Sequence, residues 1–461
     1  MYVYRVGDKN VRGLSGGQVK RLSIGVEIIS FPDLMFLDEP TTGLDSAMSL
    51  EVIAAVRNLA NQNRTVICTI HSPSLETGSL FDKLLLMSAG RVIYFGPAMD
   101  VAAFFSSSPY RFYCSPGTNP FDFAVAVAGS FVLARGDKKI PGSDLADYYA
   151  GGEAAKTLLA SLAEIISVDM TKNAESQARS GSKHATFDLP YSTSILNQIL
   201  TLCRRSFTVL KQSKGLVIST IMRYIIVATF YGSIFLNLSD GTDSTAYFSR
   251  MSIFFFSLMF LIMTHQSSIP GMITNRLLFY RERGANAYGA LPYWVSTWVT
   301  QVPLVFSSTL GFSLVLYWMV GFRAGAFGYF FYFTFAISLC GLFFSQFLAA
   351  VSQSSQMALT ITPLFLLIII LFAGFIVAIP AFPAWLAYWG PYISFMRWAY
   401  QGLVLNEFDG NTDLPLGSQY ISMQGFQDQS KEDCAAILFG FIVGMCLSVL
   451  MALKYINFEK R

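Results

Sequence analysis

Two groups of residues near the start of the chain are of types that could bind a phosphate and a metal ion. The first is Ser15, Gly16, Gly17 and Gln18, at the start of a helix expected over 19–30. Glycines let the backbone approach an anion closely, and the first N–H groups of a helix point toward it. The second is Asp38 and Glu39, which follow a short apolar strand at 34–37. One carboxylate there could hold Mg²⁺ while the other orients or deprotonates a water molecule.

Asp45 and His71 could complete a site of this kind. His71 directly follows a second β-branched run at 65–70. Short, continuous apolar runs are typical of buried parallel strands, and binding groups gather at the carboxyl ends of such strands. An isolated histidine is often structural and paired carboxylates can cap a helix, so a purely structural interpretation remains open. Two further strands are expected at 83–87 and 91–95.

The composition divides the chain into a soluble part and a membrane part. Hydrophobic residues make up 53% of the 461 residues and charged residues only 13%, compared with about 25% charged residues in ordinary soluble domains. The apolar excess lies almost entirely after Gly215. The net charge of +3 is too small to indicate a nucleic-acid partner. The six cysteines show no metal-binding spacing, so inert thiols are expected.

Six apolar stretches after Gly215 are each close to the roughly 20 residues that a membrane-spanning helix needs. They are 216–236, 250–271, 293–319, 326–351, 357–379 and 434–455. Basic residues precede the first stretch, follow the second and end the chain, whereas the loops 237–249 and 381–433 are acidic on balance. The positive-inside rule therefore predicts that both termini are cytosolic and that residues 380–433 form a long outer loop.

Between these two parts, residues 131–190 are expected to form a linker. Its polar segment 171–185 has no large apolar residues and is expected to be disordered. Residues 191–214 then combine apolar and basic side chains with helical spacing. Such a helix favours the anionic surface of the cytoplasmic membrane, and an ordinary core helix is the alternative.

The segment from Leu14-Ser15-Gly16-Gly17-Gln18 through Asp38-Glu39 to Gly43-Leu44-Asp45 resembles the signature motif, Walker B strand and D-loop of ATP-binding-cassette (ABC) proteins. Asn119-Pro120-Phe121-Asp122-Phe123 resembles the NPxDF stretch of ABC subfamily G, the White and pleiotropic-drug-resistance type. Ser72 stands where a glutamine is usual in that subfamily. A P-loop, GxxxxGK[ST], is not found in the 461 residues, and a truncated gene model is the explanation that we expect.

The resemblance implies a fold and a set of roles. Residues 1–130 would be the carboxyl-terminal portion of an α/β nucleotide-binding domain, 191–214 a connecting helix, and 215–461 an all-α, six-helix membrane domain of the ABC-2 type. The cofactors would be ATP and Mg²⁺, with Asp38 on the metal, Glu39 on the attacking water and His71 on the γ-phosphate. Each nucleotide site of a dimer would be completed by Asp45 and by the opposite subunit's copies of Ser15, Gly16, Gly17 and Gln18.

The implied function is ATP-driven export of lipid-like or amphipathic molecules by a half-transporter, as a homo- or heterodimer in the plasma membrane. No charged residue lies in the middle of the second or fifth apolar stretch, which argues against an ion pathway. The resemblance places a substrate cavity on these two stretches, at Phe256, Phe260, Met263, Phe375 and Ile376. Plain helix packing is the alternative for each of these residues. A different function also stays open, that of a non-catalytic membrane subunit that needs a partner with an intact P-loop.

Overall fold

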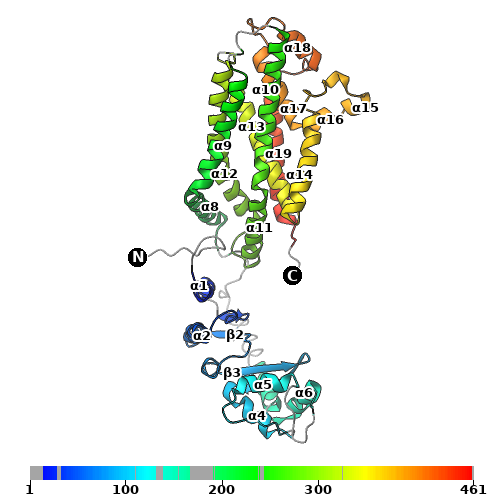
Figure 1. Cartoon of the computed structure of the whole chain (residues 1–461). Helices are drawn as coiled ribbons and strands as arrows, with labels where there is room; N and C mark the ends of the chain where they lie inside the picture. The colour runs from blue at the N-terminus through cyan, green and yellow to red at the C-terminus, as the bar shows by residue number, and fades with distance from the viewer. Residues whose placement is uncertain are drawn as a thin grey trace, which may run out of the picture. The chain divides into compact units, whose positions relative to one another are not determined.

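The computed structural model describes residues 14–28, 33–109, 111–130, 139–153, 155–166, 191, 193–236, 238, 243–323 and 325–458. The chain forms two compact units, Met1–His184 and Ala185–Arg461. In the described residues the first unit combines helices with four strands, and the second is built from helices (Figure 1).

The first half of the α/β unit is a small parallel sheet with helices packed on one face. Its elements are α1 (Gly16–Ile28), β1 (Leu34–Leu37), α2 (Ser46–Ala60), β2 (Thr65–Cys68) and α3 (Leu75–Gly78). The two strands pair in parallel, with Leu34 opposite Thr65 and Leu37 opposite Cys68. Val52 and Val56 of α2 are buried together with Ile24 of α1, in a cluster that also includes the strand residue Leu37.

The other face of this sheet is exposed, whereas the sequence predicts that both strands are buried. Leu34, Phe36 and Ile67 are 48%, 71% and 51% exposed. Side chains alternate between the two faces of a strand, so one face packs on α2 while the other presents these three residues. No element among the residues that the structure describes in this unit covers that face.

The second half of the unit is an antiparallel hairpin that packs on helices. Its elements are β3 (Lys83–Ser88), β4 (Arg91–Pro97), η1 (Ala98–Asp100), α4 (Val101–Ser107), α5 (Pro120–Ala128) and α6 (Gly142–Gly151). Ala89 and Gly90 connect the strands with φ angles of 50° and 77°, the conformation of a two-residue hairpin turn.

Helix α6 corrects the prediction that residues 131–190 form a linker. Leu145 and Ala146 of α6 are buried in one core with Ile93 of β4, and the Tyr149 hydroxyl donates to the Phe95 carbonyl at 3.3 Å. A further helical stretch covers 155–166. Short helices with apolar residues on one face thus occupy this part of the segment. The polar stretch 171–185 lies outside the described residues.

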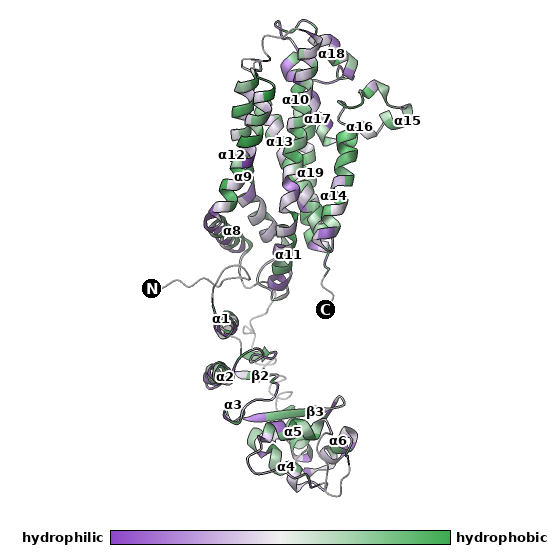
Figure 2. Ribbon diagram, in the orientation of Figure 1, coloured by the Kyte–Doolittle hydropathy of each residue, from purple (hydrophilic) through white to green (hydrophobic). Residues whose placement is uncertain are grey.

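The second unit is a bundle of long, apolar helices (Figures 1 and 2). Its elements are α8 (Ile195–Gln212), α9 (Lys214–Ile234), α10 (Ser244–Met263), η3 (Thr264–Ser268), α11 (Ile269–Gly284), α12 (Ala290–Val320), α13 (Phe327–Val351), α14 (Ser355–Leu371), η4 (Ile379–Ala381), α15 (Ala384–Ala387), α16 (Gly390–Ile393), α17 (Phe395–Phe408), α18 (Gly417–Gln424) and α19 (Lys431–Tyr455). Of the long helices, α13 is the most deeply buried.

Five helical segments among the described residues are long and apolar enough to cross a membrane. They are Lys214–Ile234, Ser244–Gly284, Ala290–Val320, Phe327–Val351 and Lys431–Tyr455. The remaining predicted span, 357–379, corresponds to α14, which has 17 residues. At 1.5 Å per residue α14 is about 26 Å long, slightly less than the roughly 30 Å hydrocarbon core of a bilayer. The presence of six spans therefore stays a prediction.

Helix α17 corrects the prediction that residues 380–433 form one long outer loop. All 14 residues of α17 are buried, and the helix packs against α13 and α19. Its hydropathy is modest because it contains polar residues, which find partners inside the bundle. The Arg397 guanidinium, for example, lies 4.7 Å and 4.4 Å from the ring centroids of Tyr392 and Trp398.

Two arginines of α11 bind the carboxyl-terminal ends of neighbouring helices. The Arg276 side chain is buried and donates to the carbonyls of Ala349 and Ala350, in the last turn of α13. Arg283 donates to the carbonyl of Lys454 at 3.3 Å and 3.2 Å, in the last turn of α19. These carbonyls have no partner within their own helices, and cations are favourable at this end of the helix dipole. Helix α11 therefore ties together the ends of two long helices.

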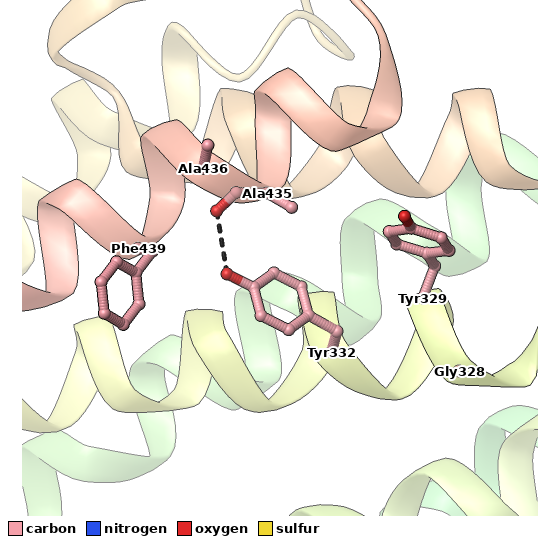
Figure 3. A pocket seen from close by; sticks show the side chains of 6 residues that line it. All are labelled: Gly328, Tyr329, Tyr332, Ala435, Ala436 and Phe439. Atoms are coloured by element: carbon pink, nitrogen blue, oxygen red, sulfur yellow. Dashed lines mark hydrogen bonds between the residues drawn. The ribbon is translucent and has the colours of Figure 1, made fainter.

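Helices α13 and α19 also contact each other near their first turns. The Tyr332 hydroxyl of α13 donates to the Ala435 carbonyl of α19 at 2.8 Å, beside a hollow between the two helices (Figure 3). Cys434 of α19 is buried next to this contact. The helices are thus close-packed on one side of the contact and separated on the other.

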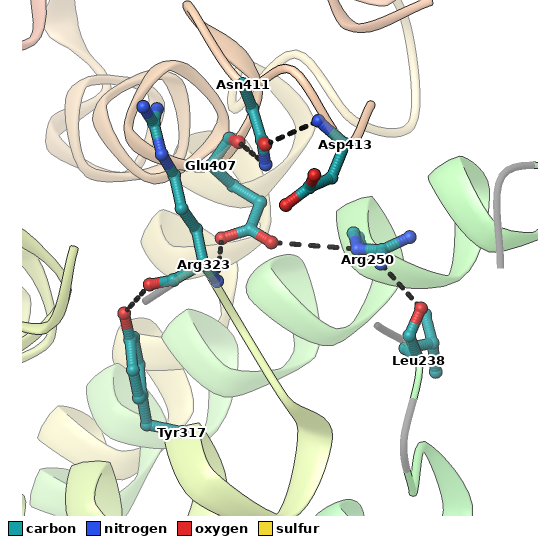
Figure 4. A network of polar contacts seen from close by, with 7 residues as sticks. All are labelled: Leu238, Arg250, Tyr317, Arg323, Glu407, Asn411 and Asp413. Carbon is teal, nitrogen blue, oxygen red and sulfur yellow. Dashed lines mark hydrogen bonds and ion pairs between the residues drawn. The ribbon is translucent and has the colours of Figure 1, made fainter. Parts of the chain in front are cut away.

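A buried ion pair connects α10 with α17 (Figure 4). Arg250 Nε lies 3.6 Å from Glu407 Oε1, and the two side chains are 3% and 4% exposed. Arg250 also donates to the Leu238 carbonyl. The second carboxylate oxygen of Glu407 accepts the backbone N–H of Arg323 at 3.1 Å, and the Tyr317 hydroxyl donates to the carbonyl of Arg323. The pair therefore joins α10 and α17 to the link between α12 and α13.

Replacing Arg276 with leucine should lower the stability of the helical unit by about 2 kcal/mol or more, because at least two buried carbonyls lose their donor. The measurement is the melting temperature of the purified full chain in detergent. Arg281→Leu on the exposed side of the same helix is the control. Equal melting temperatures for the two variants would contradict the assigned role.

Glu407→Gln should destabilise the protein by roughly 3–5 kcal/mol, because a buried guanidinium loses its carboxylate. The double variant Arg250→Met/Glu407→Gln removes both charges and keeps an acceptor for the Arg323 N–H, so most of the stability should return. Thermal melting of the single and double variants tests this coupling. If the loss of stability in the double variant equalled the sum of the losses in the two single variants, the two side chains would act independently.

Candidate functional site

The parallel pairing of β1 and β2 brings the residues that follow them to the same end of the sheet. The Thr69 N–H donates to the Leu37 carbonyl at 3.0 Å and extends the pairing by one residue. The Thr69 hydroxyl then donates to Asp38 Oδ1 at 2.7 Å and accepts the Glu39 N–H at 2.9 Å. A threonine that the sequence analysis did not single out therefore positions both candidate carboxylates.

Glu39 has a backbone conformation that is unusual for its residue type. Its φ angle is 44°, in the left-handed region that residues with a side chain seldom adopt. Its carboxylate accepts the Thr42 hydroxyl at 2.9 Å, and its carbonyl accepts Lys20 Nζ at 3.4 Å. Strained backbone of this kind often occurs at functional sites. The side chain is exposed at the strand end, where it could meet a ligand.

The predicted anion-binding residues form the start of α1. The Ser15 N–H donates to Gln18 Oε1 at 3.0 Å, and the Gln18 N–H donates to the Ser15 hydroxyl at 3.3 Å. This reciprocal arrangement is a capping box. The first bond along the helix runs from the Val19 N–H to the Ser15 carbonyl, so the N–H groups of Gly16 and Gly17 precede the helical ladder and can face an anion.

Two of the candidate residues also have clear structural uses. A Cβ added to Gly17 would lie 1.9 Å from Met48 Cε, so glycine leaves room for the end of the Met48 side chain. The Asp45 carboxylate accepts the Met48 N–H at 2.7 Å and caps α2. The structural interpretation of Asp45 is therefore supported by geometry, and a capping carboxylate keeps one oxygen for a further contact.

His71 is exposed, two residues after the threonine that positions the carboxylates. The segment that follows it is held from a distance in the sequence. Asn119 Nδ2 donates to the Pro73 carbonyl at 2.8 Å, while Asn119 Oδ1 accepts the Phe121 N–H at 3.2 Å and caps α5. Asn119 was noted in the sequence as a subfamily marker, and the structure assigns it the role of holding the loop that carries His71.

These residues suit Mg²⁺ and a phosphate better than a metal ion bound by protein groups alone. Within the described part of the chain, no three His, Cys, Asp or Glu side chains gather in a way that could hold a metal. Mg²⁺ commonly binds one or two carboxylates and takes its other ligands from phosphate and water. Exposed carboxylates at Asp38 and Glu39 fit that requirement.

Cys68, at the end of β2, does not add a nucleophile to this group. Burial raises the pKa of the Cys68 thiol to about 11. The thiol therefore stays protonated near neutral pH, and a protonated thiol is unreactive. This agrees with the expectation of an inert cysteine at this position.

The five predicted cavity residues separate into two groups in the helical unit. Phe260 stacks on Phe312 at 5.6 Å between ring centroids, and Phe375 stacks on Phe255 at 4.6 Å. These two rings take part in helix packing. The exposed residues of the set are Phe256, Met263 and Ile376. Phe260 and Phe375 therefore fit the alternative of plain helix packing. The other three predicted cavity residues lie on the surface of the helical unit.

The predicted connecting helix corresponds to α8, which is bound to the last turn of α11 and to the segment after it. Arg205 Nη1 lies 2.7 Å from Glu282 Oε1, and the Tyr288 hydroxyl donates to the other oxygen of Glu282. Burial alone would lower the pKa of Arg205, but the hydrogen bonds to Glu282 and Tyr288 outweigh it and raise the pKa. Burial and the bond to Glu282 raise the pKa of Tyr288. The guanidinium and the phenol both keep their protons, so the contact persists over the physiological pH range.

Comparison with known proteins matches both units. A family model described as an ABC-2 type transporter matches residues 197–408. ABC transporter G family member 44 of rice is 29% identical over 99% of this chain and 31% of its own length. ABC transporter G family member 6 of Dictyostelium discoideum is 32% identical over 87% of this chain and 26% of its own length. Pleiotropic drug resistance protein 1 of tobacco is 28% identical over 99% of this chain and 32% of its own length.

The chain spans about a third or less of the length of these curated relatives. The matches nevertheless extend across nearly all of its residues, from the α/β unit to the last helix, and they agree on one group of proteins. The model match lies within the helical unit, which has several membrane-length helices. The chain therefore belongs to the G family of ABC transporters, and its helical unit contains a membrane domain of the ABC-2 type.

Proposed function

We propose that this chain takes part in ATP-driven export of lipid-like or amphipathic hydrophobic molecules, as one half of a dimeric ABC transporter. The observation that carries the proposal is the arrangement at the strand ends. There Thr69 holds Asp38 and Glu39 together, and Asn119 holds the loop behind His71. The α/β unit would then be the carboxyl-terminal portion of a nucleotide-binding domain.

The roles follow from the chemistry of each residue. Asp38 would hold Mg²⁺, Glu39 would orient or deprotonate the attacking water, and His71 would contact the γ-phosphate. The N–H groups at the start of α1 in the opposite subunit would bind the same phosphate. When bound, ATP supplies the free energy of γ-phosphate hydrolysis and Mg²⁺ offsets the charge that develops. Asp45 would keep α2 in register with this site through its capping bond.

The contact of α8 with Glu282 and Tyr288 would pass movement of the nucleotide-binding part to the helices. An ion pair reinforced by a phenol hydrogen bond joins α8 to the end of α11. Helix α11 in turn holds the ends of α13 and α19 through Arg276 and Arg283. A displacement of α8 would therefore act on several helices at once.

The cargo and the membrane are inferred from charge. The basic segments at one end of the helices predict cytosolic termini, and the plasma membrane is the proposed location. The exposed apolar side chains of Phe256, Met263 and Ile376 would face a cavity shared with a second subunit. The tobacco relative is named for pleiotropic drug resistance, which agrees with an amphipathic cargo. The partner would be a second half-transporter, identical or different.

A second candidate is a membrane subunit that needs a partner with an intact P-loop. Two observations favour it. The 461 residues contain no GxxxxGK[ST], and the face of the β1–β2 sheet with Leu34, Phe36 and Ile67 is exposed. Parallel sheets are usually covered on both faces. A further segment that supplies a P-loop strand and covers this face would complete the domain.

Glu39→Gln should lower ATP hydrolysis about 100-fold, the usual contribution of a positioned general base, while ATP binding persists. Hydrolysis and binding of labelled ATP are measured on the full protein in proteoliposomes, with Glu76→Gln on α3 as the control. Activity of this chain by itself supports the first candidate. Activity that appears only with a P-loop-containing half-transporter supports the second. Hydrolysis that is insensitive to Glu39→Gln in both preparations would contradict both.

Asn119→Ser should lower hydrolysis about fivefold, equivalent to the loss of one hydrogen bond of ~1 kcal/mol. Serine can still cap α5 but lacks the Nδ2 amide that donates to the Pro73 carbonyl, so the His71 loop loses that bond while the helix keeps its cap. The comparison is Ser74→Ala, which removes the cap of α3 and leaves that bond intact. If Asn119→Ser and Ser74→Ala lowered the melting temperature and the hydrolysis rate by equal amounts, the positioning role of Asn119 would be wrong.

A further inference from the structure

A hollow on the surface of the helical bundle has no part in the function proposed above. It lies between the first turns of α13 and α19 and has a volume of about 490 Å³ (Figure 3). Its lining residues are Gly328, Tyr329, Tyr332, Ala435, Ala436 and Phe439. None of these belongs to the candidate substrate cavity. Sites for small molecules have volumes of roughly 300–1,000 Å³. The volume of this hollow falls within that range and could hold one hydrocarbon chain of a lipid.

Small residues on both helices create this space, and its walls are apolar. A Cβ added to Gly328 would meet no atom within 4 Å, and Ala435 and Ala436 have only a methyl group. Two phenols line the hollow: Tyr332 donates its hydroxyl to the Ala435 carbonyl at 2.8 Å, and Tyr329 donates its hydroxyl to Glu432 Oε1 at 3.1 Å. Both hydroxyls are therefore satisfied by the protein, and an occupant meets mainly carbon atoms.

The apolar surface continues along α19 beyond the hollow. Phe439, Val443 and Leu447 are all exposed and follow one another at intervals of four residues, so they share one side of the helix. From Lys431 to Val443 the helix rises about 18 Å. One leaflet of a bilayer has a hydrocarbon depth of roughly 15 Å, half of the ~30 Å core. An acyl chain that starts at the first turn of α19 would run along this surface.

The mouth of the hollow carries charges of both signs. Lys431 Nζ lies 5.0 Å from the centroid of the Tyr329 ring, and the hydroxyl of the same tyrosine donates to Glu432 Oε1 at 3.1 Å. The ammonium group of Lys431 could bind a phosphate. The carboxylate of Glu432, beside the Tyr329 ring, could bind a quaternary ammonium. Asp433 adds another carboxylate in the same turn, which disfavours a headgroup with a net negative charge.

We propose that this hollow is a binding site for one zwitterionic, choline-bearing phospholipid. One acyl chain lies against Gly328, Ala436 and Phe439, the phosphate lies at Lys431, and the ammonium lies at Glu432. A sterol, with a single uncharged hydroxyl, offers neither an anion to Lys431 nor a cation to Glu432. A second protein chain would need a much larger patch, about 800 Å² on each partner.

The test uses the full chain purified from vesicles of equal phosphatidylcholine, phosphatidylglycerol and cholesterol. Native mass spectrometry counts the lipids that stay bound, and no nucleotide or transport is involved. Ala436→Trp fills the hollow from an exposed position of α19. Thr229→Trp makes a similar change on the exposed side of α9 and is the control. Gly328→Leu fills the hollow from α13, in case Ala436→Trp does not fold.

The expected result is one phosphatidylcholine per chain, preferred about tenfold over phosphatidylglycerol. Ala436→Trp and Gly328→Leu should each lower that occupancy about tenfold, whereas Thr229→Trp should not. Glu432→Gln should remove most of the preference for choline and keep the bound lipid. Equal retention in Ala436→Trp and Thr229→Trp, preferential retention of cholesterol, or dissociation of a dimer by Ala436→Trp would each overturn the proposal.

Discussion

Inside a bilayer, every backbone N–H and C=O must find a partner within the protein, because hydrocarbon offers none. The helical unit meets this constraint with long helices and with side chains that reach the carbonyls at helix ends. Arg276 shows how costly groups are matched at a helix end, since a buried guanidinium needs partners and finds several at the end of α13. A buried charge thus joins α11 to the end of α13.

The same constraint explains how α17 can be polar and buried. Arg397 lies over aromatic rings, Asn406 Nδ2 donates to the Ala326 carbonyl at 3.0 Å, and Glu407 pairs with Arg250. Asn406 and Glu407 are thus matched by groups from other elements, whereas Arg397 contacts one ring of its own helix and one ring just before it. Such a network is tied to one arrangement of the helices, because a shift of any of them would leave a buried charge or amide unpaired. The polar residues therefore occupy the core and also select one arrangement of the helices.

In the α/β unit, residues with a candidate chemical role also carry structure. Ser15 and Gln18 cap α1, Asp45 caps α2, and Gly17 leaves room for the end of the Met48 side chain. Binding and folding requirements coincide here because both use free N–H groups at a helix start and carboxylates at a strand end. Substitutions at these positions will therefore change folding as well as binding, and Glu39, which caps no helix, is the cleaner probe of chemistry.

Several elements could be predicted from local pattern. The amphipathic helix at 191–214, the strands at 34–37 and 65–70 and four of the apolar spans correspond to observed elements within a few residues, and the span at 250–271 lies inside the longer helical segment Ser244–Gly284. The linker predicted at 131–190 and the outer loop predicted at 380–433 each contain a packed helix that was not expected, α6 and α17. Both differences have one cause, because short or polar helices depend on partners far away in the sequence. The exposed strand face at Phe36 was missed for a related reason, since a β-branched run shows that a strand forms and not which neighbours cover it.

The sequence by itself determined the residue types at the candidate site, the division into a soluble and a membrane part, and the family that the motifs resemble. These properties depend on composition and on spacing over a few turns of chain. Only the tertiary structure decided that Thr69 joins Asp38 to Glu39, that Asn119 holds the His71 loop and that Arg250 meets Glu407. Each of these contacts joins residues at least 30 positions apart. No local periodicity encodes such a pairing, because it arises only when packing brings distant polar groups within hydrogen-bond distance.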